Sequence, residues 1–187
     1  MIVNKVDVAT LEKARDLLFS IRRSVRYHIR RRRFFDNMNR FMTATIFVLS
    51  AGAVVSILSK INDMTVLVAT AAVTVLSIIN LVSEIPRSAW THADLARSFA
   101  EIEKQIILKG ELTEEDLKLL TAQRLELEKD EPPIMRMEDI KSHNELVKAL
   151  GLGEPEIVRL PYLKSLTSSI CNWDVTGSDS NRNLGLK

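Results

Sequence analysis

FMTATIFVLSAGAVVSILS, residues 41–59, contains no charged side chain, and neither does MTVLVATAAVTVLSIINLVS, residues 64–83. As α-helices these stretches would measure roughly 28 and 30 Å, which matches the hydrocarbon thickness of a bilayer. Only residues 60–63 separate them, so the second helix must turn straight back. The sequence therefore predicts a transmembrane helical hairpin with both termini on one side of the membrane.

A soluble protein with a buried helical hairpin is the alternative to membrane insertion. Such helices would normally carry a polar stripe, or they would need a surrounding core in which to be buried. Neither stretch has a charged residue, and the rest of the chain is strongly charged. We also expect neither stretch to be a signal peptide, because 40 residues precede the first one. Membrane insertion is therefore the favoured interpretation.

Charge is distributed unevenly along the chain. Residues 1–40 carry eleven Lys and Arg against four Asp and Glu, a net charge of +7. Residues 84–187 carry fourteen against nineteen, a net charge of −5. Basic residues next to a membrane helix stay in the cytoplasm. Both termini are therefore predicted to be cytoplasmic, and the lone Cys171 fits this compartment because it can form no internal disulfide.

Two apolar seams flank the membrane stretches and predict long cytoplasmic helices. Both show the alternating three- and four-residue spacing of a coiled coil. Pro86 should kink or restart the second helix just outside the membrane. The seams are Leu11, Ala14, Leu18, Ile21 and Val25 on a helix from about Asp7 into the bilayer, and Ile85, Ser88, His92, Leu95, Phe99, Ile102 and Ile106 after it.

Both seams become polar near the membrane. Arg32 lies eight residues before Arg40, and His92 lies eight residues after Glu84. If the two helices pack antiparallel, Arg32 and His92 should meet at the same height as a polar pair that could act as a gate. The alternative is that both side chains point into water.

Later segments predict two further helices and an irregular tail. Gly110 should end the preceding helix, and Thr113 to Asp116 has the pattern of a capping box. That helix stops at Pro132-Pro133, and a short one follows over about residues 137–150, with Gly151 as its C-cap. We predict inward-facing Leu117, Leu120 and Leu127 on the first, and Ile140, Leu146, Val147 and Leu150 on the second.

The expected fold is an all-α membrane protein with four segments. They are a basic cytoplasmic helix (1–40), the transmembrane hairpin (41–83, with helices 41–59 and 64–83), a cytoplasmic helical bundle (84–151) and an irregular tail (152–187).

Catalytic and metal-binding motifs are not apparent in the sequence. His28, His92 and His143 lie in different segments, without the spacing typical of a metal site. The Gly-x-Gly at residues 151–153 follows a helix, whereas a phosphate-binding loop would follow a strand. We therefore expect no enzyme activity, no metal and no cofactor.

A cluster of arginines precedes the first membrane stretch. Such residues reach lipid headgroups from the end of a membrane helix. Binding of an anionic second messenger or of nucleic acid is the alternative. The aromatic residues among them favour the interfacial interpretation, because the helix enters a bilayer, and we expect no nucleic acid partner. The residues predicted to contact lipid or an anionic ligand are Arg30, Arg31, Arg32, Arg33 and Arg40.

Small and polar residues follow one face of each membrane stretch. Small residues let membrane helices approach closely, and hydroxyls and amides form hydrogen bonds across the contact. The second interpretation is a weakly polar pore lining, which would require several chains because two helices cannot enclose a channel. The residues are Thr45, Gly52, Ser56 and Ser59 on the first stretch, and Thr70, Thr74, Ser77, Asn80 and Glu84 on or next to the second.

The order of these features resembles the SLATT domains, which are two-transmembrane effector domains of prokaryotic conflict systems. The similarity covers roughly residues 11–151 and includes the basic run RRSVRYHIRRRRFF (22–35), the tight hairpin and SAWTHADL (88–95). It continues with Glu131-Pro132 and His-Asn-Glu at residues 143–145. On this resemblance Arg30 to Arg33 and His92 are the family-like polar residues.

The resemblance implies a homo-oligomeric effector that perforates or depolarises the bacterial inner membrane, generally in defence against phage. No sensor domain is visible in this chain, so the trigger would come from another chain, as a sensor protein or a nucleotide signal supplied in trans, from lipid or from voltage. The competing hypothesis is a non-conducting membrane anchor or scaffold that recruits a soluble partner.

Overall fold

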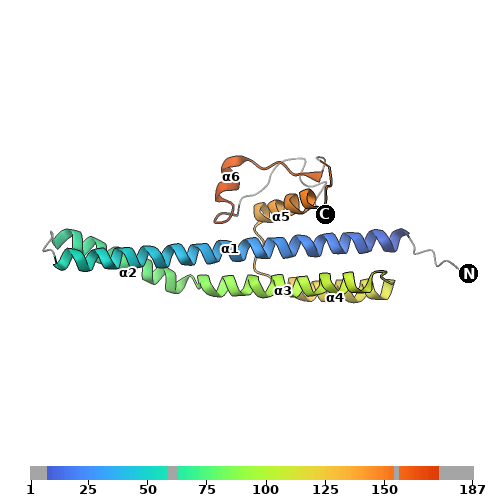
Figure 1. Ribbon diagram of the computed structural model, residues 1–187, viewed down its shortest axis with the longest axis horizontal. Coiled ribbons are helices and arrows are strands. Elements are labelled where there is room, and N and C mark those ends of the chain that lie inside the picture. The colour runs from blue at the N-terminus through green and yellow to red at the C-terminus, as the bar shows by residue number, and fades with distance from the viewer. Residues whose placement is uncertain (1–7, 59–62, 154–155, 173–187) are drawn as a thin grey trace, which may run out of the picture. The chain divides into compact units, whose positions relative to one another are not determined.

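The computed structural model describes residues 8–58, 63–153 and 156–172, and for residues 56–58, 63, 163, 164 and 166 it describes the backbone alone. The regular structure of these residues is helical, and they contain no strand, which confirms the all-α prediction. The helices in Figure 1 are α1 (Val8–Leu58), α2 (Asp63–Val82), α3 (Ile85–Lys109), α4 (Glu114–Lys129), α5 (Arg136–Ala149) and α6 (Tyr162–Thr167).

The chain divides into two compact units. Unit 1 combines Met1–Arg31 with His92–Lys187, and unit 2 is Arg32–Thr91. The predicted segment boundaries at residues 40 and 84 therefore differ from the boundaries of the units. Helices α1 and α3 each begin in one unit and end in the other. α1 is a single helix of 51 residues, as the absence of Pro and Gly before Gly52 predicts.

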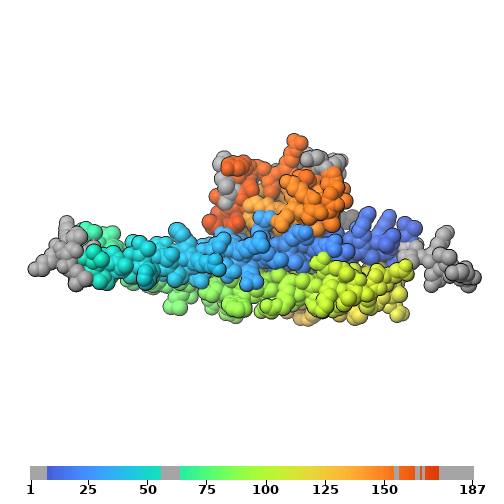
Figure 2. All heavy atoms as spheres, in the orientation of Figure 1, coloured from blue at the N-terminus to red at the C-terminus, as the bar shows by residue number. Residues whose placement is uncertain are grey.

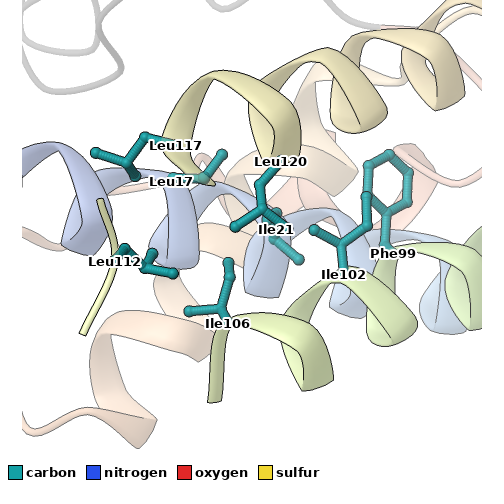
Figure 3. Packing of buried hydrophobic residues seen from close by; sticks show 8 residues of the cluster. All are labelled: Leu17, Ile21, Phe99, Ile102, Ile106, Leu112, Leu117 and Leu120. Atoms are coloured by element: carbon teal, nitrogen blue, oxygen red, sulfur yellow. The ribbon is translucent and has the colours of Figure 1, made fainter. Parts of the chain in front are cut away.

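Unit 1 is built around an apolar core shared by α1, α3 and α4 (Figure 3). The predicted seam residues Ile21, Phe99, Ile102 and Ile106 are buried in it. Leu17 is buried where Leu18 was the predicted seam residue, and Leu18 packs against the edge. Three helices meet here, so α1 buries a wider face than a two-helix seam requires. Leu112, Leu117 and Leu120 complete the core, with Ala14, Leu18, Val25 and Leu127 packed against it.

The connection from α3 to α4 follows local sequence rules. Gly110 has φ +69°, a left-handed conformation that favours glycine and ends α3. Thr113 Oγ1 accepts from the Asp116 backbone N–H at 3.2 Å, and Asp116 Oδ2 accepts from the Thr113 N–H at 3.1 Å. The predicted capping box is therefore present at the start of α4.

Helix α5 and the segment after it pack on α1 within unit 1, and Figure 2 shows α5 (orange) against α1 (blue). Ile140, Leu146 and Val147 are buried as predicted, but Leu150 is 44% exposed. The region from residue 152 onward was predicted to be irregular. In the described part, however, it contains α6, and the buried Ser168 is held by side chains of α5. Non-local hydrogen bonds order this segment, and they leave no periodic pattern in the sequence.

Unit 2 contains two apolar segments, in α1 and α2, that are long and apolar enough to cross a membrane. Neither segment is buried within the structure. α2 ends at Val82 and α3 begins at Ile85, so Pro86 lies in the first turn of a new helix, as predicted. Between them Glu84 adopts φ +44°, which is uncommon for a residue other than glycine.

Candidate functional site

One enclosed polar cluster of unit 1 consists of two histidines and a glutamate. His28 comes from α1, His92 from α3 and Glu131 from the connection between α4 and α5. The two Nδ1 atoms of the histidines lie 2.9 Å apart, and His28 Nε2 lies 3.0 Å from Glu131 Oε1. His28 is 1% exposed and His92 is 3% exposed. A continuous hydrogen-bonded chain thus links three elements away from water.

Aromatic rings enclose the histidines. The ring of Phe99 stacks on His28 with a centroid distance of 5.6 Å and an interplanar angle of 11°. Tyr27 meets His28 and His92 edge to face at 5.2 and 6.2 Å. The Tyr27 hydroxyl accepts a hydrogen bond from the Met135 N–H at 3.0 Å, and burial raises the pKa of this hydroxyl. These rings therefore shield the two imidazoles from water.

The geometry limits where hydrogens can reside. A carboxylate accepts hydrogen bonds, so His28 Nε2 must carry the hydrogen that faces an ionised Glu131. The gap between the two Nδ1 atoms holds one hydrogen, so one nitrogen donates and the other accepts. The pair can therefore be neutral, or it can carry one positive charge with His28 donating to both neighbours.

His92 favours its neutral form. Burial disfavours the imidazolium, and the charges of His28 and Arg31 oppose it further, so the pKa of His92 falls from 6.5 to about 4. Arg31 is itself buried, and burial lowers the pKa of its guanidinium. At neutral pH His92 is therefore uncharged.

The predicted partner of His92 is corrected from Arg32 to His28. Arg32 is exposed, and its Nε lies 3.5 Å from Asp36 Oδ2 on the same helix. The contact between His28 and His92 was not predicted from the sequence. The sequence did contain a signal, because His28 continues the spacing of the first seam, three residues after Val25 and one turn before Arg32.

The arginine cluster divides into two groups. Arg30 Nη2 donates to Glu145 Oε2 at 2.6 Å, and its Nε lies 3.7 Å from Glu138 Oε2. Arg31 is buried and donates from Nη1 to the Ser169 carbonyl at 2.7 Å. The burial of Arg31 contradicts the predicted contact of this residue with lipid or an anionic ligand, whereas for the partly exposed Arg30 the contact stays a prediction. Arg32, Arg33 and Arg40 are exposed, and for them it stays a prediction.

Glu138 connects α5 to the segment that covers Arg31. Its carboxylate accepts from Ser168 Oγ at 2.5 Å, Lys141 Nζ at 2.9 Å and Ser169 Oγ at 2.9 Å. Burial alone would raise the pKa of this carboxyl, but these hydrogen bonds outweigh burial and lower the pKa. Glu138 therefore remains charged and has a structural role. This role could not be predicted from the sequence, because Ser168 and Ser169 lie about 30 residues away in the chain.

The structure separates the small and polar residues of the membrane stretches. Thr45 and Asn80 lie on partly buried faces of α1 and α2, which is consistent with helix packing. On α2 that face is Val66, Ala69, Val73, Leu76 and Asn80, at alternating three- and four-residue spacing. Gly52 is exposed, and an added Cβ there would meet nothing within 4 Å. Ser59 and the side chain of Ser56 lie outside the described residues.

Thr70, Thr74 and Ser77 share a different face of α2 and are exposed. The hydroxyls of Thr70 and Thr74 donate to the carbonyls of Val66 and Thr70 at 2.8 and 2.9 Å. Such internal hydrogen bonds satisfy the hydroxyls inside a membrane without a second helix. Packing of the chain on itself therefore does not explain this row. Glu84 is also exposed, and it forms an ion pair with Arg87 at 2.9 Å.

Comparison with family models, curated proteins and solved structures finds no match to this chain. In the part of the chain that the structure describes, no three His, Cys, Asp or Glu side chains gather in a way that could hold a metal ion. A function for this chain can therefore be inferred only from its own sequence and structure.

Proposed function

We propose that this chain is a two-transmembrane effector similar to the SLATT domains, which oligomerises and depolarises the bacterial inner membrane in a conflict or anti-phage system. Its apolar segments in α1 and α2 would form a hairpin across the bilayer, with both termini in the cytoplasm. The basic residues Arg33 and Arg40, which are exposed, would lie on the cytoplasmic side.

The observation that carries this proposal is the exposed row of Thr70, Thr74 and Ser77 on α2. An exposed row of hydroxyls on a largely apolar helix fits a contact between copies or a weakly polar pore wall. Both interpretations require several chains, because two helices cannot enclose a channel. An assembly in which α2 helices face one another would place this row along a shared axis.

Continuity of α1 supports a gating role for unit 1. The same helix contributes Leu17 and Ile21 to the core of unit 1 and then continues into the apolar segment without a break. A rotation or shift of α1 in the cytoplasm would therefore reach the membrane directly. A sensor protein or a nucleotide signal supplied in trans would act on unit 1.

The test is to measure membrane potential and dye leakage in a bacterial host that expresses the chain. Replacement of Thr70 and Ser77 with Leu should abolish depolarisation, because it converts the row into an apolar surface. The control is Val75→Leu with Ile78→Leu, two exposed positions on other faces of α2, which should retain activity. Equal accumulation of all variants in the membrane fraction must be shown.

A non-conducting scaffold that recruits a soluble partner is the competing function. If the Thr70/Ser77 variant depolarises cells as strongly as the parent chain, the row is not a pore wall. If the parent leaves the membrane potential unchanged with its genomic neighbours co-expressed, the pore proposal fails and the scaffold is favoured.

A further inference from the structure

We propose that His28, His92 and Glu131 form a proton-sensitive latch, which holds α1 against α3 while the imidazole pair carries at most one positive charge and releases them when both imidazoles are protonated. The latch is a property of unit 1 alone. That its release changes membrane conductance rests on the proposed function.

The contact between the two Nδ1 atoms is the sensitive element. At 2.9 Å one nitrogen must donate and the other must accept. When both imidazoles are protonated, each Nδ1 carries a hydrogen, and neither can accept. Two hydrogens would then point at each other in a gap that fits one. The doubly charged pair is therefore incompatible with the observed geometry, and the rings must separate.

Charged groups from more than one element face the histidine pair. Glu131, from the α4–α5 connection, supplies a negative charge to His28 at 3.0 Å. Arg31 of α1 adds positive charge that opposes protonation of His92. Phe99 of α3 and Tyr27 of α1 cover the imidazole rings but contribute no charge. Asp139 of α5 is engaged with Arg23 at 3.3 Å.

The latch lies where α1 and α3 leave unit 1, so its release affects the parts of both helices next to that boundary. His28 lies three residues before Arg31, the last residue of unit 1 in α1, and His92 is the first residue of unit 1 in α3. Both helices therefore leave unit 1 within a turn of the contact. Ile21, Ile102 and Ile106 belong to the apolar core, on the other side of the latch from the unit boundary. Release at the histidines therefore frees α1 and α3 near that boundary and does not require the core to unfold.

The experiment measures the distance between α1 and α3 as the pH is lowered. The full chain, with Cys171→Ser, is reconstituted in liposomes and spin-labelled at Ile29→Cys and Asp94→Cys, which are exposed positions of unit 1 beside the latch. The distance between the two spin labels is measured by double electron–electron resonance from about pH 7.5 to about pH 4, the range in which histidines titrate. The parent should show one short distance at neutral pH and a growing longer-distance population on acidification.

Two variants should change this response in opposite directions. His92→Gln keeps a side chain that can donate to His28 Nδ1 but cannot gain a proton, so the short distance should persist at acidic pH. Glu131→Gln removes the charge that stabilises a protonated His28 in the latched state. The latched state is then weaker, so the longer distance should appear at higher pH. His143→Gln replaces a buried histidine of α5 that lies outside the latch, and it should behave like the parent.

The result that overturns the latch is a longer distance that appears in His92→Gln at the same pH as in the parent, or no change of distance in the parent. Circular dichroism establishes that each variant is folded at neutral pH, and the upward shift in Glu131→Gln tests the latch if His92→Gln does not fold. Dye release is recorded in the same liposomes. A distance change without release contradicts the proposed pore and leaves the latch standing.

Discussion

The Nδ1 atoms of His28 and His92 lie 2.9 Å apart although the residues are 64 positions apart in the chain. The pKa of His92 is about 4 in the folded protein, whereas it is 6.5 for an ordinary histidine. Between these values the unfolded chain binds more protons than the folded chain, so stability falls as the pH is lowered from 6.5 toward 4. The difference corresponds to roughly 3 kcal/mol.

This pH dependence can be measured by denaturant unfolding of the detergent-solubilised chain, followed by circular dichroism at a series of pH values. His92→Gln should lose less stability than the parent over the same range, because its side chain does not titrate. His143→Gln is the matched control. An equal loss in the parent and in His92→Gln would assign the acid sensitivity to other groups.

Stability of unit 1 should depend strongly on Leu120 and hardly at all on its neighbour Leu119. Leu120 is 1% exposed in the core, whereas Leu119 is 56% exposed. Leu120→Ala should cost about 3 kcal/mol of unfolding free energy because it leaves a cavity. Leu119→Ala should stay within about 0.5 kcal/mol of the parent. Denaturant unfolding measures both, and similar losses would show that α4 does not pack as described.

Local sequence rules were sufficient for helices α1 to α5 and for much of the core. The spacing of Phe99, Ile102 and Ile106 identified the buried face of α3, because a helix repeats every 3.6 residues whatever its partner is. The capping pattern at Thr113 identified the start of α4 for a similar reason, since both hydrogen bonds lie within four residues. These features are encoded over one or two turns.

The contact between His28 and His92 could not be located in the same way. It depends on the relative register of two helices that are far apart in the sequence. The prediction of the Arg32–His92 pair counted residues outward from Arg40 and Glu84. It assumed that these two residues lie at the same height and that one continuous helix runs from Glu84 to His92. The structure breaks the helix between Val82 and Ile85, and Glu84 has φ +44°. The partner of His92 is consequently one turn away from the predicted Arg32.

The capping box of α4 predicts a second local effect on stability. Thr113→Ala removes the acceptor of the Asp116 N–H and should cost about 1 kcal/mol. Thr121→Ala, at an exposed position inside the same helix, should be neutral or slightly stabilising, because Ala has the higher helix propensity. Denaturant unfolding compares the two variants. Equal effects would mean that the cap does not contribute to the stability of α4.

Asn144 should hold the segment after α5 in place. Its Nδ2 donates to the Val158 carbonyl at 2.7 Å, and its Oδ1 accepts from the Val158 N–H at 2.9 Å. Asn144→Asp keeps the acceptor but sets a carboxylate oxygen against the carbonyl, which should cost about 1–3 kcal/mol locally. Because this bond is remote from the core of α1, α3 and α4, the loss should appear as opening of residues 156–172 rather than as global unfolding.

Hydrogen–deuterium exchange with mass spectrometry resolves that opening. Peptides covering residues 156–172 should exchange faster in Asn144→Asp, whereas peptides from α3 and α4 should be unchanged. Asn37→Asp is the matched control, because Asn37 is exposed on α1 and the same substitution there should change neither set. Faster exchange throughout unit 1 would show that the segment and the core unfold together. Unchanged exchange at residues 156–172 would mean that other contacts, such as Lys141 Nζ to the Ser165 carbonyl at 2.7 Å, hold the segment without Asn144.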